Sequence, residues 1–351
     1  MKRQTDDKQF LDPVFLRYGQ EVYTNDFAQS IREDVLERKK QGKRLANLIP
    51  QEGFQETVCT QDADLLIVGG RKGGGKSWVA LFMAMRNMFN PDVALYAFRK
   101  YEDDVRRGPW KEAKKTYRGF GTAKDSLYEF AFLDGKGATM KMEHIADLGK
   151  ISDRFRGAEL AYIDLEELPE HTRENLDVIF DFLAVNRNTA GVKSQMVATC
   201  NPVGWKNKLR KFLEWYIDPE TDTIIRERDG KKRYMFKYGH DDSEIAWGNS
   251  WEEVYAHPKA KMKIDLLLMG RDDLTPEDMI MTVQFIEGDY SDNKILQITD
   301  KRYISRLASK GDGSVVNDLA GVWRDIDEGT GLLAGQDINK FFKNTEQRGD
   351  G

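Results

Sequence analysis

A glycine-rich stretch between an apolar run and a helical pattern constrains this chain more than any other feature. Residues 65–68 are apolar, residues 69–77 read GGRKGGGKS, and residues 78–89 place large apolar side chains at helical spacing. The Walker A spacing G-x-x-x-x-G-K-S is met by Gly70, Gly75, Lys76 and Ser77. Glycines let backbone N–H groups curl around phosphate oxygens, and a helix N-terminus adds its dipole. The stretch therefore predicts a strand, a phosphate-binding loop and a helix.

The residue types of this loop suit a nucleotide. Lys76 would reach the β- and γ-phosphates as a point charge, and Ser77 would offer its hydroxyl to Mg²⁺. The helical stripe that begins at Trp78 is expected to pack on the sheet. We expect the nucleotide contacts to come from the whole loop: Gly70, Arg71, Lys72, Gly73, Gly74, Gly75, Lys76, Ser77 and Trp78.

A second stretch places acids at the end of an apolar run. Residues 160–165 read as a buried strand, and Asp164, Glu166 and Glu167 stand at its end. A phosphate-loop hydrolase needs one carboxylate for the water shell of Mg²⁺ and another to polarise the attacking water. Side chains alternate along a strand, so Asp164 and Glu166 share a face. The pattern leaves open whether Asp164 or Glu166 is the metal-side acid.

Polar residues at three further places are candidates for the same site. Thr199–Asn201 end the apolar strand of residues 191–198 and could sense the γ-phosphate or cap a turn. Gln51 or Gln55 could read an adenine edge, since an amide offers a donor and an acceptor, but solvent exposure fits the spacing equally. Arg99 ends the strand of residues 92–98, where ligands approach an open sheet, or is a surface charge.

Composition narrows the class of protein. The 351 residues are 32% charged and 40% hydrophobic, and no apolar run approaches the roughly 20 residues of a membrane span, so we expect a soluble protein without a secretory signal. Cys59 and Cys200 are expected as free thiols of a reducing compartment. The net charge of −5 requires any nucleic-acid contact to be local, and residues 204–216, with four basic residues and two tryptophans, are a DNA-facing or partner-facing loop or a solvated helix.

The predicted fold class is α/β, with a mostly parallel sheet, helices on both faces and a small helical subdomain near the C-terminus. We expect a hairpin over residues 128–142 and helices over 26–40, 101–117, 257–270 and 275–286. A further helix should begin near Thr172. The expected segments are a charged N-terminal part, an ATPase core, a helical lid or linker and a flexible tail, at residues 1–44, 45–250, 251–330 and 331–351.

Over residues 45–330 the chain resembles the ATPase domain of phage large terminase subunits, which package DNA into proheads. The resemblance rests on PQEGFQ, ADLLIVGGRKGGGKS, FRGAELAYIDLEEL, VATCNP and LAGVW, which occur in this order. It implies an ASCE-type P-loop NTPase that uses ATP and Mg²⁺, with Glu166 as the metal-side acid and Glu167 as the catalytic glutamate. Asp164 then becomes a strand residue or a group behind the metal ligand. Thr199–Asn201 would match the coupling motif, and Gln51 or Gln55 the adenine-reading element.

The sequence departs from this family in two places. Many members carry Asp where this chain has Glu166, which keeps the register of the acids open. Complete large terminases continue into a nuclease domain, and we expect none here, so the chain is an isolated motor domain or a shortened protein. The family also implies an arginine finger: Arg156 reaching a neighbouring subunit's nucleotide, or Arg71 acting within its own.

The implied activity is Mg²⁺-dependent ATP hydrolysis that drives double-stranded DNA into a prohead. The implied partners are double-stranded DNA, a homo-oligomeric ring expected to be a pentamer, a portal protein and a small terminase subunit, in the host cytoplasm and away from membranes. Two other functions fit the motifs: a helicase-like nucleic-acid ATPase and a slowly hydrolysing nucleotide-gated assembly switch. A GTPase is disfavoured, because neither N-K pair of the chain is followed by the Asp of N-K-x-D.

Overall fold

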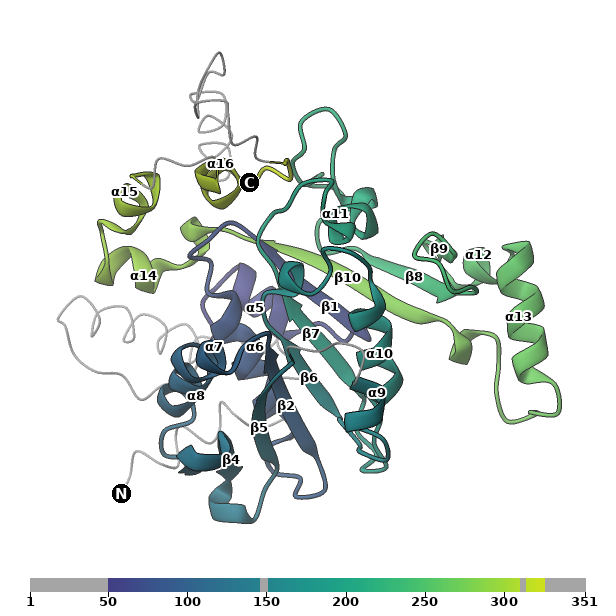
Figure 1. Ribbon diagram of the computed structural model, residues 1–351, viewed down its shortest axis with the longest axis horizontal. Coiled ribbons are helices and arrows are strands. Elements are labelled where there is room, and N and C mark those ends of the chain that lie inside the picture. Colours follow the sequence, from purple (N-terminus) through teal and green to yellow (C-terminus); the bar gives the residue numbers. More distant parts are fainter. Residues whose placement is uncertain (1–49, 146–150, 310–313, 326–351) are drawn as a thin grey trace.

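A ten-stranded mixed sheet forms the centre of the computed structural model (Figure 1), which describes residues 50–145, 151–309 and 314–325. The strand order is β3-β4-β5-β2-β6-β7-β1-β10-β8-β9. The strands are β1 (Leu65–Gly70), β2 (Ala94–Arg99), β3 (Gly121–Lys124), β4 (Glu129–Phe132), β5 (Thr139–His144), β6 (Tyr162–Leu165), β7 (Gln195–Thr199), β8 (Lys232–Lys237), β9 (Ile245–Gly248) and β10 (Met281–Gly288).

The inner six strands, from β5 to β10 in the sheet order, run parallel to one another. Antiparallel strands extend the sheet at both ends, with β4 and β3 beside β5, and β8 and β9 beside β10. Strand β7 lies between β1, which precedes the glycine-rich loop, and β6, which precedes the acids. This order confirms the predicted α/β class with a mostly parallel sheet.

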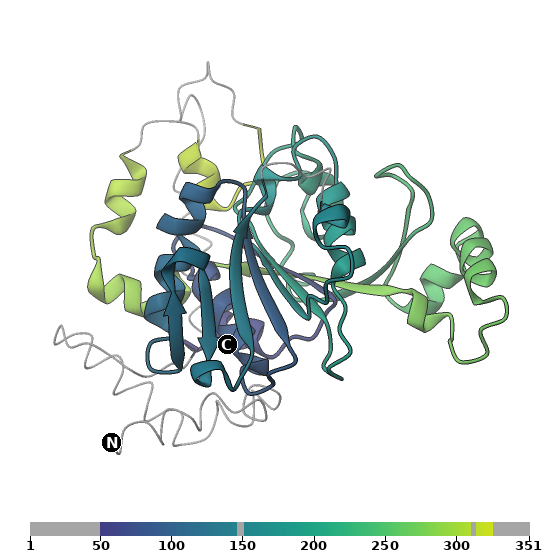
Figure 2. The same ribbon diagram turned by 60° about the horizontal axis from the view of Figure 1, so that its bottom comes forward.

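Helices cover both faces of the sheet (Figures 1 and 2). Strand β1 shows why: Leu66 and Val68 pack into the core with α5, α6 and α8, whereas Leu65 and Ile67 pack into the opposite core with α9, α10 and α11. The helices of these layers are α5 (Phe54–Cys59), α6 (Lys76–Ala84), α7 (Glu102–Arg107), α8 (Pro109–Thr116), α9 (Ile151–Arg154), α10 (Asp177–Val185) and α11 (Lys208–Phe212).

The remaining helices lie at two distant places. Helices α12 (Trp251–Tyr255) and α13 (Pro258–Leu268) pack on β8 and β9 around a small core of their own and project from the sheet, whereas α14 (Lys294–Thr299), α15 (Tyr303–Ala308) and α16 (Ser314–Ala320) lie on the opposite side of the molecule (Figures 1 and 2). In the part of the chain that the structure describes, no helix is long and apolar enough to cross a membrane.

The helix predicted over residues 275–286 is wrong. These residues contain a short 3₁₀ turn and most of β10, which pairs with β1 from Leu65 opposite Val283 to Gly70 opposite Gly288. The ladder between segments 218 residues apart outweighs the local apolar spacing. Residues 251–330 therefore include a central strand as well as helices.

Two other helix predictions need correction. The helix expected over residues 101–117 is broken into α7 and α8 at Gly108–Pro109, because proline has no N–H for a continuous helical ladder. The helix expected near Thr172 begins at Asp177, after a short 3₁₀ turn over Leu168–Glu170.

The other element predictions agree with the structure or fall outside it. The strands of the glycine-rich loop and of the acids, the hairpin of β4 and β5, and the helix over 257–270 are confirmed. The cysteines Cys59 and Cys200 are free and buried. The predicted helix over residues 26–40 and the tail over 331–351 lie outside the described residues.

Candidate phosphate-binding site

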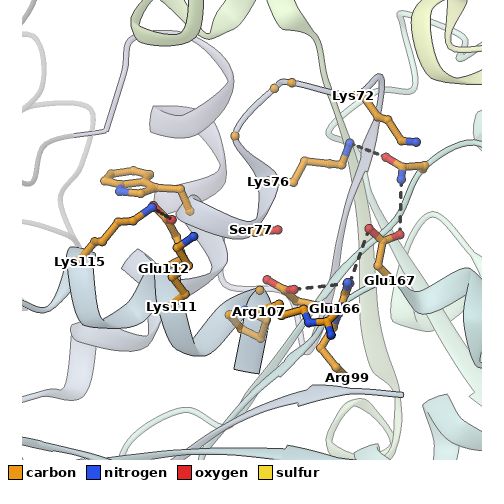
Figure 3. A pocket seen from close by; sticks show the side chains of 17 residues that line it. Lys72, Lys76, Ser77, Arg99, Arg107, Lys111, Glu112, Lys115, Glu166 and Glu167 are labelled. Carbon is orange, nitrogen blue, oxygen red and sulfur yellow. Dashed lines mark hydrogen bonds and ion pairs between the residues drawn. The ribbon is translucent and has the colours of Figure 1, made fainter. Parts of the chain in front are cut away.

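The carboxyl ends of four parallel strands bring separate segments of the chain to one edge of the sheet. Strand β1 leads into the glycine-rich loop, β2 ends at Arg99, β6 is followed by Glu166, and β7 is followed by Asn201. A cavity of about 570 Å³ opens at this edge (Figure 3). Its lining consists of Lys72, Gly73, Gly74, Gly75, Lys76, Ser77, Trp78, Arg99, Arg107, Gly108, Pro109, Lys111, Glu112, Lys115, Glu166, Glu167 and Asn201.

The glycine-rich loop owes its shape to left-handed backbone conformations. Gly70 and Gly75 have φ angles of 97° and 86°, and Gly75 is the residue before the first turn of α6. A Cβ on Gly75 would lie 2.4 Å from Nε2 of Gln55, so a side chain there would displace the Gln55 amide as well as strain the backbone. The loop thus wraps the N-terminus of α6, the arrangement that binds anions in other proteins.

Lys76 is folded back onto the loop. Its Nζ donates hydrogen bonds to the carbonyl oxygens of Gly70 at 2.9 Å and Arg71 at 2.8 Å, and to Oδ1 of Asn201 at 3.0 Å. Burial lowers the pKa of Lys76 to about 8. A phosphate placed at the loop would give this ammonium group the counter-charge that its three neutral acceptors lack.

Glu166, Glu167 and Arg99 form a charged cluster opposite Lys76 (Figure 3). Nη1 of Arg99 lies 3.6 Å from a carboxylate oxygen of Glu166 and 3.6 Å from one of Glu167. Glu167 has a left-handed φ of 55°; its N–H donates to Oγ1 of Thr199 at 3.1 Å, and its Oε2 accepts from Nδ2 of Asn201 at 3.4 Å. The amide side chain of Asn201, just after β7, therefore links Lys76 to Glu167.

Glu166 and Ser77 fit a magnesium site. Burial raises the pKa of Glu166 to about 7, and the nearby Arg99 charge and a hydrogen bond with Ser77 oppose that rise. Oε1 of Glu166 is buried without a hydrogen-bond partner, so it is available to a cation or its water. Within the described ranges no group of three His, Cys, Asp or Glu side chains could hold a metal ion. An ion held by Ser77 and Glu166 would take its other ligands from water and phosphate, as Mg²⁺ commonly does.

Asp164 lies deeper than the two glutamates. It is fully buried, neither carboxyl oxygen has a hydrogen-bond partner, and it does not line the cavity. Burial, and secondarily the charge of Glu166, raises its pKa well above the usual range. The structure brings Glu166 and Glu167 to the loop and leaves Asp164 behind them, so a metal-ligand role for Asp164 has no geometric support here.

The candidate adenine-reading glutamines are engaged elsewhere. Gln51 donates through Nε2 to Oδ1 of Asn293 at 3.0 Å and accepts from the N–H of Ile295 at 3.0 Å. Oε1 of Gln55 accepts from the N–H of Gln51 at 2.9 Å. Neither glutamine lines the cavity. Gln51 instead contacts the start of α14, where Asn293 joins that helix to the phosphate loop by donating to the carbonyl of Gly73 at 2.7 Å.

The two candidate arginine fingers also point away from the cavity. Nη1 of Arg71 pairs with Asp289 at 2.7 Å, directly after β10. Arg156 has a side chain 81% exposed and pairs with Asp153 at 2.5 Å. Neither arginine lines the cavity. Lys72 lines the cavity but pairs with Asp318 of α16 at 2.7 Å, so the C-terminal helices also contact the loop.

Sequence reasoning missed one wall of the cavity. Helices α7 and α8 contribute Arg107, Lys111 and Lys115 to it. Figure 3 shows Lys111 and Lys115 on the opposite side from Lys72 and Glu167, and Arg107 close to Glu166. Lys111 and Lys115 are four residues apart in α8 and so share a helical face, which was the available signal. The lining as a whole has six basic and three acidic side chains, in a protein of net charge −5, so the cavity favours a polyanion.

Comparisons with known proteins found similar chains among solved structures. No protein-family model and no curated protein matches the sequence. Among solved structures, the large terminase ATPase domain of Thermus Phage P74-26 is 11% identical with a TM-score of 0.39, covering 82% of this chain and 96% of that chain. The large terminase of the thermophilic bacteriophage D6E, in complex with ATP-gamma-S, is 15% identical with a TM-score of 0.39, covering 82% of this chain and 52% of that chain. At such low identity, any functional conclusion depends on the geometry of this chain's own site.

Proposed function

We propose that this chain is the Mg²⁺-dependent ATP-hydrolysing subunit of a motor that moves double-stranded viral DNA into a prohead. One observation carries the hydrolase part: a continuous set of contacts runs from Lys76 of the phosphate loop through Asn201 to Glu167, and on through Arg99 to Glu166. Cation, amide and acids thus meet at one cavity, which is what hydrolysis of a triphosphate requires.

In this proposal each group has a distinct task. Lys76 exchanges its carbonyl acceptors for the β- and γ-phosphates, and the loop N–H groups bind the phosphate oxygens. Bound Mg²⁺, held by Ser77 and Glu166, would neutralise charge on the transferred phosphoryl group. Glu167 polarises the attacking water from the opposite side, while Asn201 positions it relative to the phosphate end of the site. Arg99 orients the carboxylates of Glu166 and Glu167, and its charge opposes the rise in the pKa of Glu166.

The motor part of the proposal rests on the order of the motifs. The proline-glutamine element, the phosphate loop, the acidic strand end, the polar tip of β7 and LAGVW follow one another as in large terminase ATPase domains. A packaging motor acts as a ring on a portal, with a small terminase subunit supplying the DNA end. Exposed Arg156 is then available to a neighbouring subunit's nucleotide. Of residues 204–216, the exposed Trp205, Lys206, Lys208 and Lys211 are available to DNA, whereas Arg210 is buried and pairs with Asp222.

Phosphate release measured with and without Mg²⁺ tests the hydrolase part. We expect ATP turnover that EDTA abolishes and that Lys76→Ala lowers at least 100-fold, because the β/γ-phosphates lose their cation. Lys136→Ala is the matched control, since Lys136 is exposed in the turn between β4 and β5 and does not line the cavity. Parent-level turnover in Lys76→Ala would show that hydrolysis occurs elsewhere.

Displacement of a third strand from duplex DNA tests the motor part. A translocating ring should strip a triplex-forming oligonucleotide from double-stranded DNA in the presence of ATP, and Glu167→Gln should abolish this. ATP turnover without displacement, in conditions that assemble rings, would favour an assembly switch. Unwinding of the duplex itself would favour a helicase.

A further inference from the structure

Trp78 lines the cavity and has no role in the proposed hydrolysis of the phosphates. It follows Ser77 on the first turn of α6. The indole is half-buried, and one of its faces stacks on Phe82, with ring centroids 5.0 Å apart and an angle of 11° between the planes. The opposite face and the ring edges are what remains to meet a ligand.

The direction of the cavity determines where a nucleoside would lie. In Figure 3, Glu167 stands at one end and Glu112 and Lys115 at the other, with Ser77 between them. The lysine and serine of a phosphate loop hold the β- and γ-phosphates. The γ-phosphate therefore faces Glu167, and the ribose and base extend toward α8. Trp78, next to Ser77, belongs to this second end.

The cavity lining offers a nucleobase an aromatic ring to stack on, but few fixed hydrogen-bonding groups for the edge of the base. Among the described residues that line the cavity, Trp78 is the one aromatic side chain. Gln51 and Gln55, the candidates for reading an adenine edge, are bonded to each other and to the start of α14 outside the cavity. Near Trp78 the polar groups are long side chains such as Glu112 and Lys115, which are 38% and 55% exposed.

We propose that the nucleobase of the bound triphosphate stacks on Trp78, and that the site accepts purine nucleoside triphosphates with little discrimination between adenine and guanine. This inference rests on the proposed function, since the loop must hold the phosphates for the base to reach Trp78. Stacking tolerates any base because every base has a π-face. Strong selection needs buried hydrogen-bonding groups that the wrong base leaves unpaired, and the polar side chains that α8 contributes here, Lys111, Glu112 and Lys115, are not buried.

The dissociation constants of three ligands distinguish the contribution of the nucleobase to binding from that of the phosphates. ATP, GTP and inorganic tripolyphosphate are titrated, with Mg²⁺, into the full chain and its Trp78→Ala and Trp78→Phe variants in a calorimeter. We expect ATP and GTP to bind the parent within about tenfold of each other. Trp78→Ala should weaken both on the order of tenfold and leave tripolyphosphate unchanged, and Trp78→Phe should restore most of the loss.

Two results overturn the inference. Equal weakening of tripolyphosphate by Trp78→Ala would mean that the indole only shapes the phosphate loop. A preference of the parent for ATP over GTP above 100-fold would mean that the base edge is read, and this result needs no variant to fold. Lys76→Ala tests the proposed function separately: if it leaves tripolyphosphate binding intact, the phosphate site itself is wrong.

Discussion

Residues at the ends of neighbouring strands hold Glu167 in position. Its backbone is held in a left-handed conformation by a hydrogen bond from its N–H to Thr199, and its carboxylate lies between Asn201 and Arg99. Such a conformation is unfavourable for a side-chain-bearing residue and persists only where the surroundings enforce it. We infer that the neighbouring strands β2 and β7 aim this carboxylate at the phosphate loop.

His171 is a buried histidine whose ionisation the fold opposes. Both ring nitrogens are buried without partners, and burial, followed by the charges of Lys100 and Arg99, lowers the pKa to about 4 from an ordinary value of 6.5. Below pH 6.5 the unfolded chain binds a proton that the folded chain does not, so folding stability falls as the pH falls. The difference amounts to about 3 kcal/mol, complete near pH 4 and absent above pH 7.

Urea unfolding at pH 7 and pH 4.5 checks this prediction. The parent should lose stability relative to His171→Gln over that interval, because glutamine does not titrate. Other groups contribute equally to both proteins and cancel in the comparison. Parallel pH profiles for the two proteins would exclude the predicted role of His171.

The phosphate loop depends on a glycine at position 75. Gly75 and Gly119 have φ angles of 86° and 89°, but a Cβ on Gly75 would meet Gln55, and a Cβ on Gly119 would meet nothing within 4 Å. We expect Gly75→Ala and Gly119→Ala each to lose about 1 kcal/mol of stability from backbone strain. Only Gly75→Ala should also lose nucleotide binding, measured with a fluorescent ATP analogue. Parent affinity in Gly75→Ala would show that the loop tolerates displacement of Gln55.

Local patterns could be predicted from the sequence, and contacts between distant segments could not. The strand, loop and helix at residues 65–89 and the acids after β6 each lie within a short window, where apolar spacing and residue type suffice. Strand β10 was missed because its pairing with β1 joins segments 218 residues apart. Gln51 was misplaced for the same reason, since its amide partner Asn293 is 242 residues away.

The cavity differs in charge from the molecule as a whole. The net charge is −5, whereas the cavity at the sheet edge is lined by twice as many basic as acidic side chains. The arm of α12 and α13 projects on the opposite side of the molecule from α14–α16 (Figure 2).

Subunit mixing tests whether Arg156 acts between subunits. Because Arg156 is 81% exposed and does not line the cavity, it would complete a neighbour's site in the proposed ring. Arg156→Ala and Glu167→Gln should each be inactive, and mixing them should restore part of the turnover. Each variant mixed with itself is the control. No recovery in conditions that form rings would exclude the action of Arg156 between subunits.

ATP turnover per chain, measured against protein concentration with and without double-stranded DNA, tests the central claim most directly. The account predicts that turnover rises faster than linearly with concentration, that DNA increases it, and that Glu167→Gln removes it. Glu170→Gln should keep parent turnover, because the exposed Glu170 follows the same loop but does not line the cavity. Weak turnover that is linear in concentration and survives Glu167→Gln would contradict both the catalytic role of Glu167 and the assembling motor.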